Sequence, residues 1–189
     1  MSKNVLIAYG SRFGCTEEVS HKIAKMLEKE GIDSHLLNLR KTKAKKWPSI
    51  EEFDGILVGS SIKIAKWTKE PKTFLEKHKE EFNKKEKILG MFVCCASAAT
   101  DYDFAKKEYL EKVMETIGIT ADIYDAFGGV LDLSKFSRMG FLDKKMLKMA
   151  AKQMQEEKGV RIEENEKNDL RDWDQIQRFA GEFAALVKG

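Results

Sequence analysis

A run of six residues near the N-terminus has the composition of a phosphate-binding loop. Ser11-Arg12-Phe13-Gly14-Cys15-Thr16 follows an apolar stretch and precedes a helical pattern. Backbone N–H groups of such a turn and of a helix N-terminus can face a phosphate, and the helix dipole favours the anion. Ser11 and Thr16 would add hydroxyl donors, and Gly14 would let the backbone approach the ligand closely. The alternative is a plain strand-to-helix turn in which Thr16 caps the helix.

Other phosphate-binding loops are excluded by what this run lacks. It has no Gly-Lys-Ser/Thr, which a P-loop NTPase needs, and no Gly-x-Gly-x-x-Gly, which marks a dinucleotide-binding Rossmann site. A cysteine phosphatase is excluded because Cys15 is followed six positions later by His21 instead of arginine. A response-regulator receiver is excluded because no acidic pair ends the preceding apolar stretch.

The remaining reactive side chains form no legible catalytic set, so catalytic residues stay unassigned. Cys94 and Cys95 are adjacent, and neighbouring residues of a strand point to opposite faces. We therefore interpret both as small buried hydrophobic residues. The histidines His21, His35 and His78 lie on three different elements without ligand spacing, so no metal site is expected.

Strands alternate with helices along the chain, and this order predicts the sheet that would position the loop. Apolar runs predict buried strands at 5–9, 36–39, 55–59, 88–95 and 123–130. Helical spacing begins at Thr16, Pro71, Phe104 and Asp172, whereas the connection between the second and third strands has little helix signal. Five such strands fit a doubly wound α/β fold with a parallel sheet in the order 2-1-3-4-5. A ligand would then lie at the carboxyl ends of strands one and three.

Length and composition are those of one globular α/β domain. The 189 residues are 42% hydrophobic and 34% charged, which excludes a disordered chain and a membrane bundle. A net charge of +3 is nearly balanced, so no nucleic acid is expected as a partner. Three cysteines argue against a secreted disulfide framework, and a strand-like run stands where a signal peptide would. The expected location is the cytoplasm.

Residues 131–168 exceed what a minimal five-strand fold needs, and we interpret them as an insertion within a single domain, 1–189. The insertion contains one helical block, Phe141 to Lys158, and six basic residues against one acid, Asp143, between 135 and 152. Such a helix can lie on an anionic membrane, guard a pocket for a flat anionic substrate, or pack on the domain edge with a solvated face. The basic residues are Lys135, Arg138, Lys144, Lys145, Lys148 and Lys152.

Three segments together resemble the flavodoxin-like family. Ser11 to Thr16 is similar to the FMN-phosphate loop of flavodoxins, and the match extends to Val58–Lys63 and to Asp172–Gln175. With the insertion, nearly the whole chain resembles the branch of menaquinone-dependent protoporphyrinogen IX oxidases. Phe13 departs from this pattern, since flavodoxin loops usually carry a polar residue there, and Cys15 is also uncommon.

The resemblance implies FMN as the cofactor. The residues that would hold its phosphate are Ser11, Arg12, Phe13, Gly14, Cys15 and Thr16. Those that would lie beside the isoalloxazine ring are Ser60, Ser61, Ile62, Lys63 and Ile64, with Trp67 as a pocket wall or a loop anchor. Those whose backbone would donate to the flavin N1/O2 edge are Cys95, Ala96, Ser97 and Ala98. Tyr102 would stack on the ring or pack on the next helix, and Gly128 and Gly129 would allow close approach or only end a strand.

The resemblance also implies an FMN-dependent oxidoreductase that passes electrons from a porphyrinogen to a quinone-type acceptor. The alternatives are an electron carrier with protein redox partners, an FMN-dependent quinone reductase, and an interaction module that has lost FMN. The balanced charge speaks against a carrier, because carriers of this family are generally strongly acidic. The expected partners are a small-molecule redox substrate and, through the basic insertion, the inner face of the membrane; an oligomer is compatible with the sequence.

Overall fold

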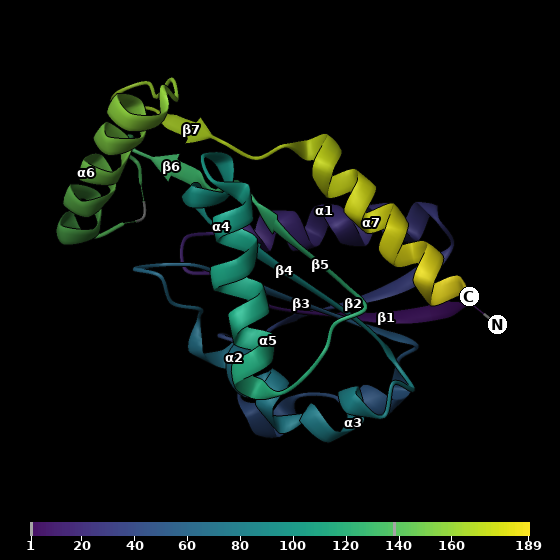
Figure 1. Ribbon diagram of the computed structural model, residues 1–189. Coiled ribbons are helices and arrows are strands. Elements are labelled where there is room, and N and C mark those ends of the chain that lie inside the picture. The colour runs from purple at the N-terminus through teal and green to yellow at the C-terminus, as the bar shows by residue number, and fades with distance from the viewer. Residues whose placement is uncertain (1, 138) are drawn as a thin grey trace.

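A five-stranded parallel sheet forms the centre of the computed structural model, which describes residues 2–137 and 139–189 (Figure 1). The strand order β2-β1-β3-β4-β5 confirms the doubly wound order predicted from the sequence. The strands are β1 (Lys3–Gly10), β2 (Ile32–Asn38), β3 (Gly55–Ser61), β4 (Ile88–Cys94) and β5 (Ile123–Phe127).

Helices cover both faces of the sheet (Figure 1). One face carries α1 (Cys15–Lys29) and α7 (Trp173–Lys188). The other carries α2 (Lys69–Lys77), α3 (Lys79–Asn83) and a continuous helix made of α4 (Tyr102–Lys106), a π-helical turn (Lys107–Glu111) and α5 (Lys112–Ile117). Between β2 and β3 lie only two short 3-10 turns, Ala44–Lys46 and Ile50–Glu52, as the weak helix signal predicts.

Strand β1 shows why the apolar run at its centre forms a buried strand. Val5 and Ile7 pack toward α1 and α7, while Leu6 and Ala8 pack toward α2 and the α4–α5 helix. All four are fully buried, and burial of each large aliphatic side chain contributes about 1.5–3 kcal/mol. The register sets the carboxyl ends of β1, β3 and β4 side by side, since Gly10 lies opposite Ser60. This edge positions the loops of the candidate site.

Two predicted strand boundaries are wrong by three residues or more. Strand β2 begins at Ile32 instead of residue 36, because this edge strand is only partly buried and so has no continuous apolar run; Ile32 is buried while Asp33 and His35 are exposed. Strand β5 ends at Phe127 instead of residue 130. The chain leaves the sheet at Gly128, where a Cβ atom would lie 1.9 Å from the carbonyl oxygen of Leu170.

The insertion is carried on its own two-stranded ribbon. Strand β6 (Val130–Asp132) pairs antiparallel with β7 (Lys167–Asp169), and α6 (Phe141–Lys158) lies between them in the chain. Figure 1 shows the ribbon and α6 standing beyond the end of the sheet.

Helix α6 packs on the ribbon through a small separate core and leaves much of its surface exposed. Ala151 and Met154 contact Leu131 and the chain that returns to β7. Phe141, at the start of α6, is 82% exposed. Among the described residues no helix is long and apolar enough to cross a membrane. Arg138, one of the predicted basic residues, lies outside the described residues.

Candidate cofactor site

A cavity of about 630 Å³ lies at the carboxyl ends of β3 and β4, between the loop after β1 and the insertion. It is lined on one side by the three loops that the sequence predicts and on the other by β6 and α6. The predicted site residues that it brings together are Ser11, Phe13, Gly14, Cys15, Ser61, Ile62, Lys63, Ile64, Cys95, Ala96 and Gly129.

The loop after β1 leaves the N-terminus of α1 open to an anion. Gly14 is the N-cap of α1 with φ +98°, a backbone conformation that L side chains rarely adopt. Among residues 2–137 and 139–189 no side chain caps α1; instead Ser11 Oγ accepts a hydrogen bond of 3.0 Å from the Gly14 N–H. The first N–H groups of the helix are therefore left to solvent or to a bound anion.

Thr16 supplies an independent sign that this terminus fits a phosphate. Its side chain is fully buried, and its Oγ1 has no hydrogen-bond partner among the described residues. A buried hydroxyl without a partner is destabilising, and a phosphate at the N-terminus of α1 would supply the missing acceptor. Thr16 is not among the residues that line the cavity, but the loop as a whole fits the phosphate of FMN.

Arg12 does not point toward this terminus. Its guanidinium donates to the carbonyl oxygens of Ser61 at 2.7 Å and Trp67 at 2.8 Å, and more weakly to that of Lys66 at 3.3 Å. Arg12 therefore joins the loop after β1 to the loop after β3. Its predicted role as a phosphate ligand would have to come from its backbone.

The segment that Arg12 holds is a tight turn with strained backbone. Lys63 and Lys66 exchange two backbone hydrogen bonds, of 3.0 and 3.1 Å. Ile64 and Ala65 between them have φ +49° and +54°, in the left-handed region. Such a conformation is unfavourable for a β-branched residue such as isoleucine, so the contacts of Arg12 stabilise a turn that its own sequence disfavours.

Cations hold the two carboxylates at the start of α1. Glu17 lies 3.2 Å from Lys41, and Glu18 lies 2.8 Å from Arg171. Burial raises the pKa of Glu17, but the hydrogen bond and charge of Lys41 more than offset this, so the pKa lies below its ordinary value. Both carboxylates are thereby paired beside a terminus that favours anions.

Sequence reasoning missed two arginines at this loop. Arg40, which follows β2, donates to the Ser11 carbonyl oxygen at 2.8 Å. The side chain of Arg171 is only 3% exposed, pairs with Asp169 at 2.6 Å and lies over the ring of Trp173. The basic character after β2 was a signal for Arg40. No sequence motif around Arg171 predicts its place in the site, because its partner Glu18 lies in a distant part of the chain.

An ion pair joins the insertion to the turn after β3. Lys63 Nζ lies 2.6 Å from Asp143 in the first turn of α6 and 5.7 Å from the ring centroid of Phe13. Both members of the pair are about one-third exposed or less. The contact holds the start of α6 at the mouth of the cavity.

Several predicted site residues lie outside this cavity. Trp67 is buried in the core, where its Nε1 donates to the Tyr109 carbonyl oxygen at 2.6 Å. Ser60 is also buried, and its Oγ accepts from the Thr68 N–H at 3.0 Å. Ser97 donates its hydroxyl to the sulfur of Cys95 at 3.4 Å.

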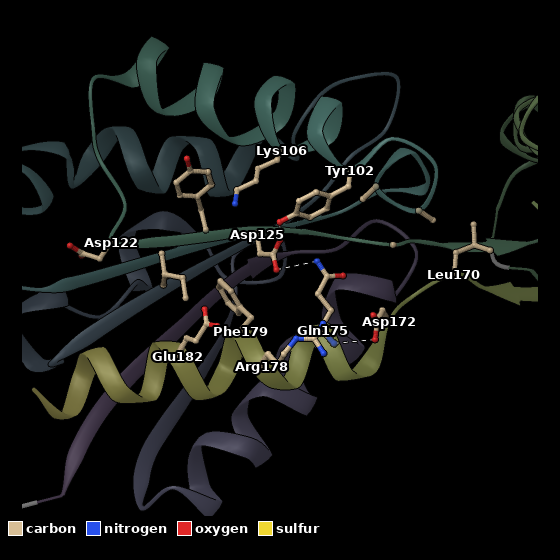
Figure 2. Close-up of a pocket in the computed structure, with 15 residues that line it drawn as sticks. Tyr102, Lys106, Asp122, Asp125, Leu170, Asp172, Gln175, Arg178, Phe179 and Glu182 are labelled. Carbon is tan, nitrogen blue, oxygen red and sulfur yellow. Dashed lines mark hydrogen bonds between the residues drawn. The ribbon is translucent and has the colours of Figure 1, made fainter. Parts of the chain in front are cut away.

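A second depression, of about 850 Å³, runs along the free edge of β5 and takes in three more predicted residues, Ala98, Tyr102 and Gly128. Figure 2 shows Tyr102 from α4 and Gln175 from α7 both pointing toward Asp125. Tyr102 donates its hydroxyl to Asp125 at 2.7 Å, and Gln175 donates to the other carboxylate oxygen at 3.1 Å. Burial and the nearby Asp125 raise the pKa of Tyr102. Tyr102, Asp125 and Gln175 are thus paired with one another.

Comparison with known sequences identifies a matching family model and a distant relative. A family model described as a flavodoxin domain matches residues 6–161. The protoporphyrinogen IX dehydrogenase (quinone) of Escherichia coli strain K12 is 24% identical over 182 residues, which are 96% of this chain and 95% of that protein.

Solved structures share the fold at lower identity. A mutant flavodoxin from Pseudomonas aeruginosa superposes with a TM-score of 0.56 at 15% identity, over 98% of this chain and 99% of that one. The rubredoxin oxygen:oxidoreductase of Desulfovibrio gigas gives a TM-score of 0.56 at 13% identity, and the match covers 98% of this chain but only 36% of that larger one.

Proposed function

This chain belongs to the flavodoxin family and binds FMN, and from that premise we propose that it oxidises a porphyrinogen and passes the electrons to a quinone. The observation that carries the proposal is the position of the insertion over the cavity. Helix α6 and strand β6 form one wall of the cavity, and binding of the FMN phosphate by the loop after β1 does not require this wall. The Escherichia coli relative, whose name states both substrate and acceptor, aligns along almost the whole chain.

FMN supplies reversible one- and two-electron chemistry, and the residues of this chain bind and orient it. The N-terminus of α1 would hold the phosphate, with Ser11 and Gly14 shaping the loop. The turn at Lys63 and the backbone at Ala96 line the same cavity and would lie along the ring. No side chain of the cavity is assigned as an acid or base.

The wall contributed by the insertion suits a large, apolar substrate with carboxylate arms. Phe136, Met146 and Leu147 line it with apolar side chains. Lys63 and Lys167 line the same cavity, and each is already paired with a carboxylate, Asp143 or Glu18. Exchange of these partners for the carboxylates of a substrate would keep each ammonium group paired.

The outer surface of the insertion favours contact with a membrane, where a quinone would be found. Phe141 is 82% exposed, and Leu142 is 73% exposed. Lys144 and Lys145 follow in α6 after Asp143. Apolar side chains among lysines are typical of helices that lie in the interface of an anionic bilayer.

The test is an anaerobic mixture of the FMN-loaded protein with protoporphyrinogen IX, followed by the flavin absorbance. We expect bleaching that a quinone reverses. If the flavin stays oxidised although dithionite still reduces it, the porphyrinogen proposal is wrong. Reduction by a protein partner or a nicotinamide would then favour the electron carrier or the quinone reductase.

A further inference from the structure

Asp143 connects the insertion to the turn that borders the cofactor cavity. Its carboxylate lies 2.6 Å from the ammonium group of Lys63, and both residues line the cavity. Across residues 2–137 and 139–189, no other hydrogen bond or ion pair joins α6 to the five-stranded domain. Lys144, the next residue of α6, donates to Ser134, which belongs to the insertion itself. The first turn of α6 is therefore attached to the sheet through a single pair of charges.

The second half of α6 is fixed by packing instead. Ala151 and Met154 are buried in the small core that α6 shares with the β6–β7 ribbon. Phe141 and Leu142, at the other end of the helix, are exposed. The ion pair is thus the contact that keeps the first turn of α6 at the mouth of the cavity.

Of the two charged partners, Asp143 is the one that can move away. The backbone of Lys63 is fixed, because its N–H and its carbonyl oxygen are both bonded to Lys66, and Arg12 also donates to Lys66. Asp143 lies about two turns before the first buried residue of α6, Ala151. When Asp143 leaves Lys63, its carboxylate stays in the first turn of α6, where the helix dipole favours a negative charge.

The Lys63 ammonium group needs a negative partner. Its side chain is 35% exposed, and its Nζ lies 5.7 Å from the ring centroid of Phe13, which also lines the cavity. A partly buried ammonium group is costly without a paired charge. The second pair at the cavity, Lys167 and Glu18, is looser at 3.5 Å, and both of its side chains are about half exposed. A carboxylate that enters the cavity therefore gains most at Lys63, where it must displace Asp143.

We propose that Asp143 is an internal competitor for the substrate: it pairs with Lys63 while the cavity is empty, is displaced by a carboxylate arm of the substrate, and pairs again when the product leaves. The inference rests on the proposed function and adds to it the residue that regulates access to Lys63. A porphyrin with free carboxylates restores the charge pair that its entry breaks. An ester of the same porphyrin carries no charge, so it has to bind beside an intact pair.

The experiment measures how protoporphyrin IX and its dimethyl ester bind to the full-length, FMN-loaded protein, by titration followed through the porphyrin fluorescence. We expect Asp143→Asn to bind the acid about threefold more tightly than the wild type, the factor typical of a partly exposed ion pair. The affinity for the ester should stay unchanged. An unchanged affinity for the acid, or an equal gain for acid and ester, would overturn the inference.

Two further variants locate the effect. Asp132→Asn removes another carboxylate that lines the cavity, one that in the described part of the chain accepts from Ser134 and not from a lysine. This matched control should leave the affinity for the acid unchanged. In a Lys63→Met protein, Asp143→Asn should have no further effect. A gain in Asp132→Asn as large as in Asp143→Asn, or a gain that persists without Lys63, would replace exchange at Lys63 by a general effect of charge.

The same measurements separate this inference from the proposed function. If neither porphyrin binds and protoporphyrinogen IX does not reduce the flavin, the proposed function is wrong and the inference falls with it. If the porphyrin binds and the porphyrinogen bleaches the flavin, but Asp143→Asn behaves like the wild type, the inference alone is wrong. The flavin content of each variant reports whether it has folded.

Discussion

Replacement of Arg12 by alanine should open the turn that contains Ile64 and Ala65. The Arg12 guanidinium makes two short hydrogen bonds, to the carbonyl oxygens of Ser61 and Trp67, and one longer bond to Lys66. These are the contacts through which the loop after β1 holds the loop after β3. Without these hydrogen bonds, nothing from the loop after β1 offsets the backbone strain of the closed turn.

The two opposing free energies are similar in size. Left-handed backbone costs about 1–2 kcal/mol for each L residue, so Ile64 and Ala65 together store roughly 2–4 kcal/mol. A hydrogen bond to a charged group contributes about 1.5–3 kcal/mol. Because Arg12 is half-buried, we reduce its two short bonds to a joint contribution of about 2–4 kcal/mol. Loss of this contribution leaves the strain uncompensated, and the closed turn should no longer be the dominant state.

Hydrogen exchange at single amides measures this opening directly. The N–H groups of Lys63 and Lys66 are bonded to each other's carbonyl oxygens, so their exchange reports the closed turn. A loss of about 2 kcal/mol should speed their exchange about 30-fold in Arg12→Ala. Arg40→Ala is the matched control, because Arg40 donates to the Ser11 carbonyl oxygen and not to this turn. Unchanged exchange at Lys63 and Lys66 in a folded Arg12→Ala protein would refute the reasoning.

Three further outcomes are expected. Gly14→Val should weaken FMN binding at least tenfold in a fluorescence titration, because φ +98° costs a β-branched residue about 1–2 kcal/mol or more; undiminished affinity would remove Gly14 from the site. Burial lowers the pKa of His78 in the folded protein. The unfolded chain therefore binds a proton at His78 more readily than the folded protein does. The free energy of unfolding should be highest above pH about 6.5 and should fall as the pH drops toward the folded-state pKa. His78→Phe should flatten this dependence in urea denaturation between pH about 5 and 7, and an unaltered slope would contradict the assignment. Lys63→Ala, which breaks the pair with Asp143, should reduce substrate turnover more than FMN affinity, whereas Lys152→Ala on the exposed side of α6 should change neither.

The sequence pattern predicted the part of the site whose residues are contiguous in the chain. The loop from Ser11 to Thr16 is readable because its strand, turn and helix signals are contiguous, and the carboxyl ends of parallel strands meet at one edge. The strand order followed from alternation alone, and the family comparison confirms FMN.

Contacts between distant segments explain what the sequence did not reveal. Gly128 ends β5 because the backbone of Leu170 passes against it, and no pattern at residues 123–130 encodes that contact. Trp67 resembles a pocket aromatic by position, yet its indole N–H finds a carbonyl oxygen at Tyr109 and its ring joins the core. Arg171 reaches Glu18 only because β7 returns the chain to the start of α1.

The polar groups beside β5 also decide what this side of the sheet can bind. Asp125 accepts from the Ala126 N–H at 2.8 Å, and Gln175 donates to the Ala126 carbonyl oxygen at 3.3 Å. An exposed strand edge is a template on which further strands, including those of other copies, can assemble. Here the middle of the edge is already occupied by side chains, so an incoming strand would have to break these bonds first. The edge is thereby protected against strand-by-strand aggregation, because the side chains of Asp125 and Gln175 are fixed against it.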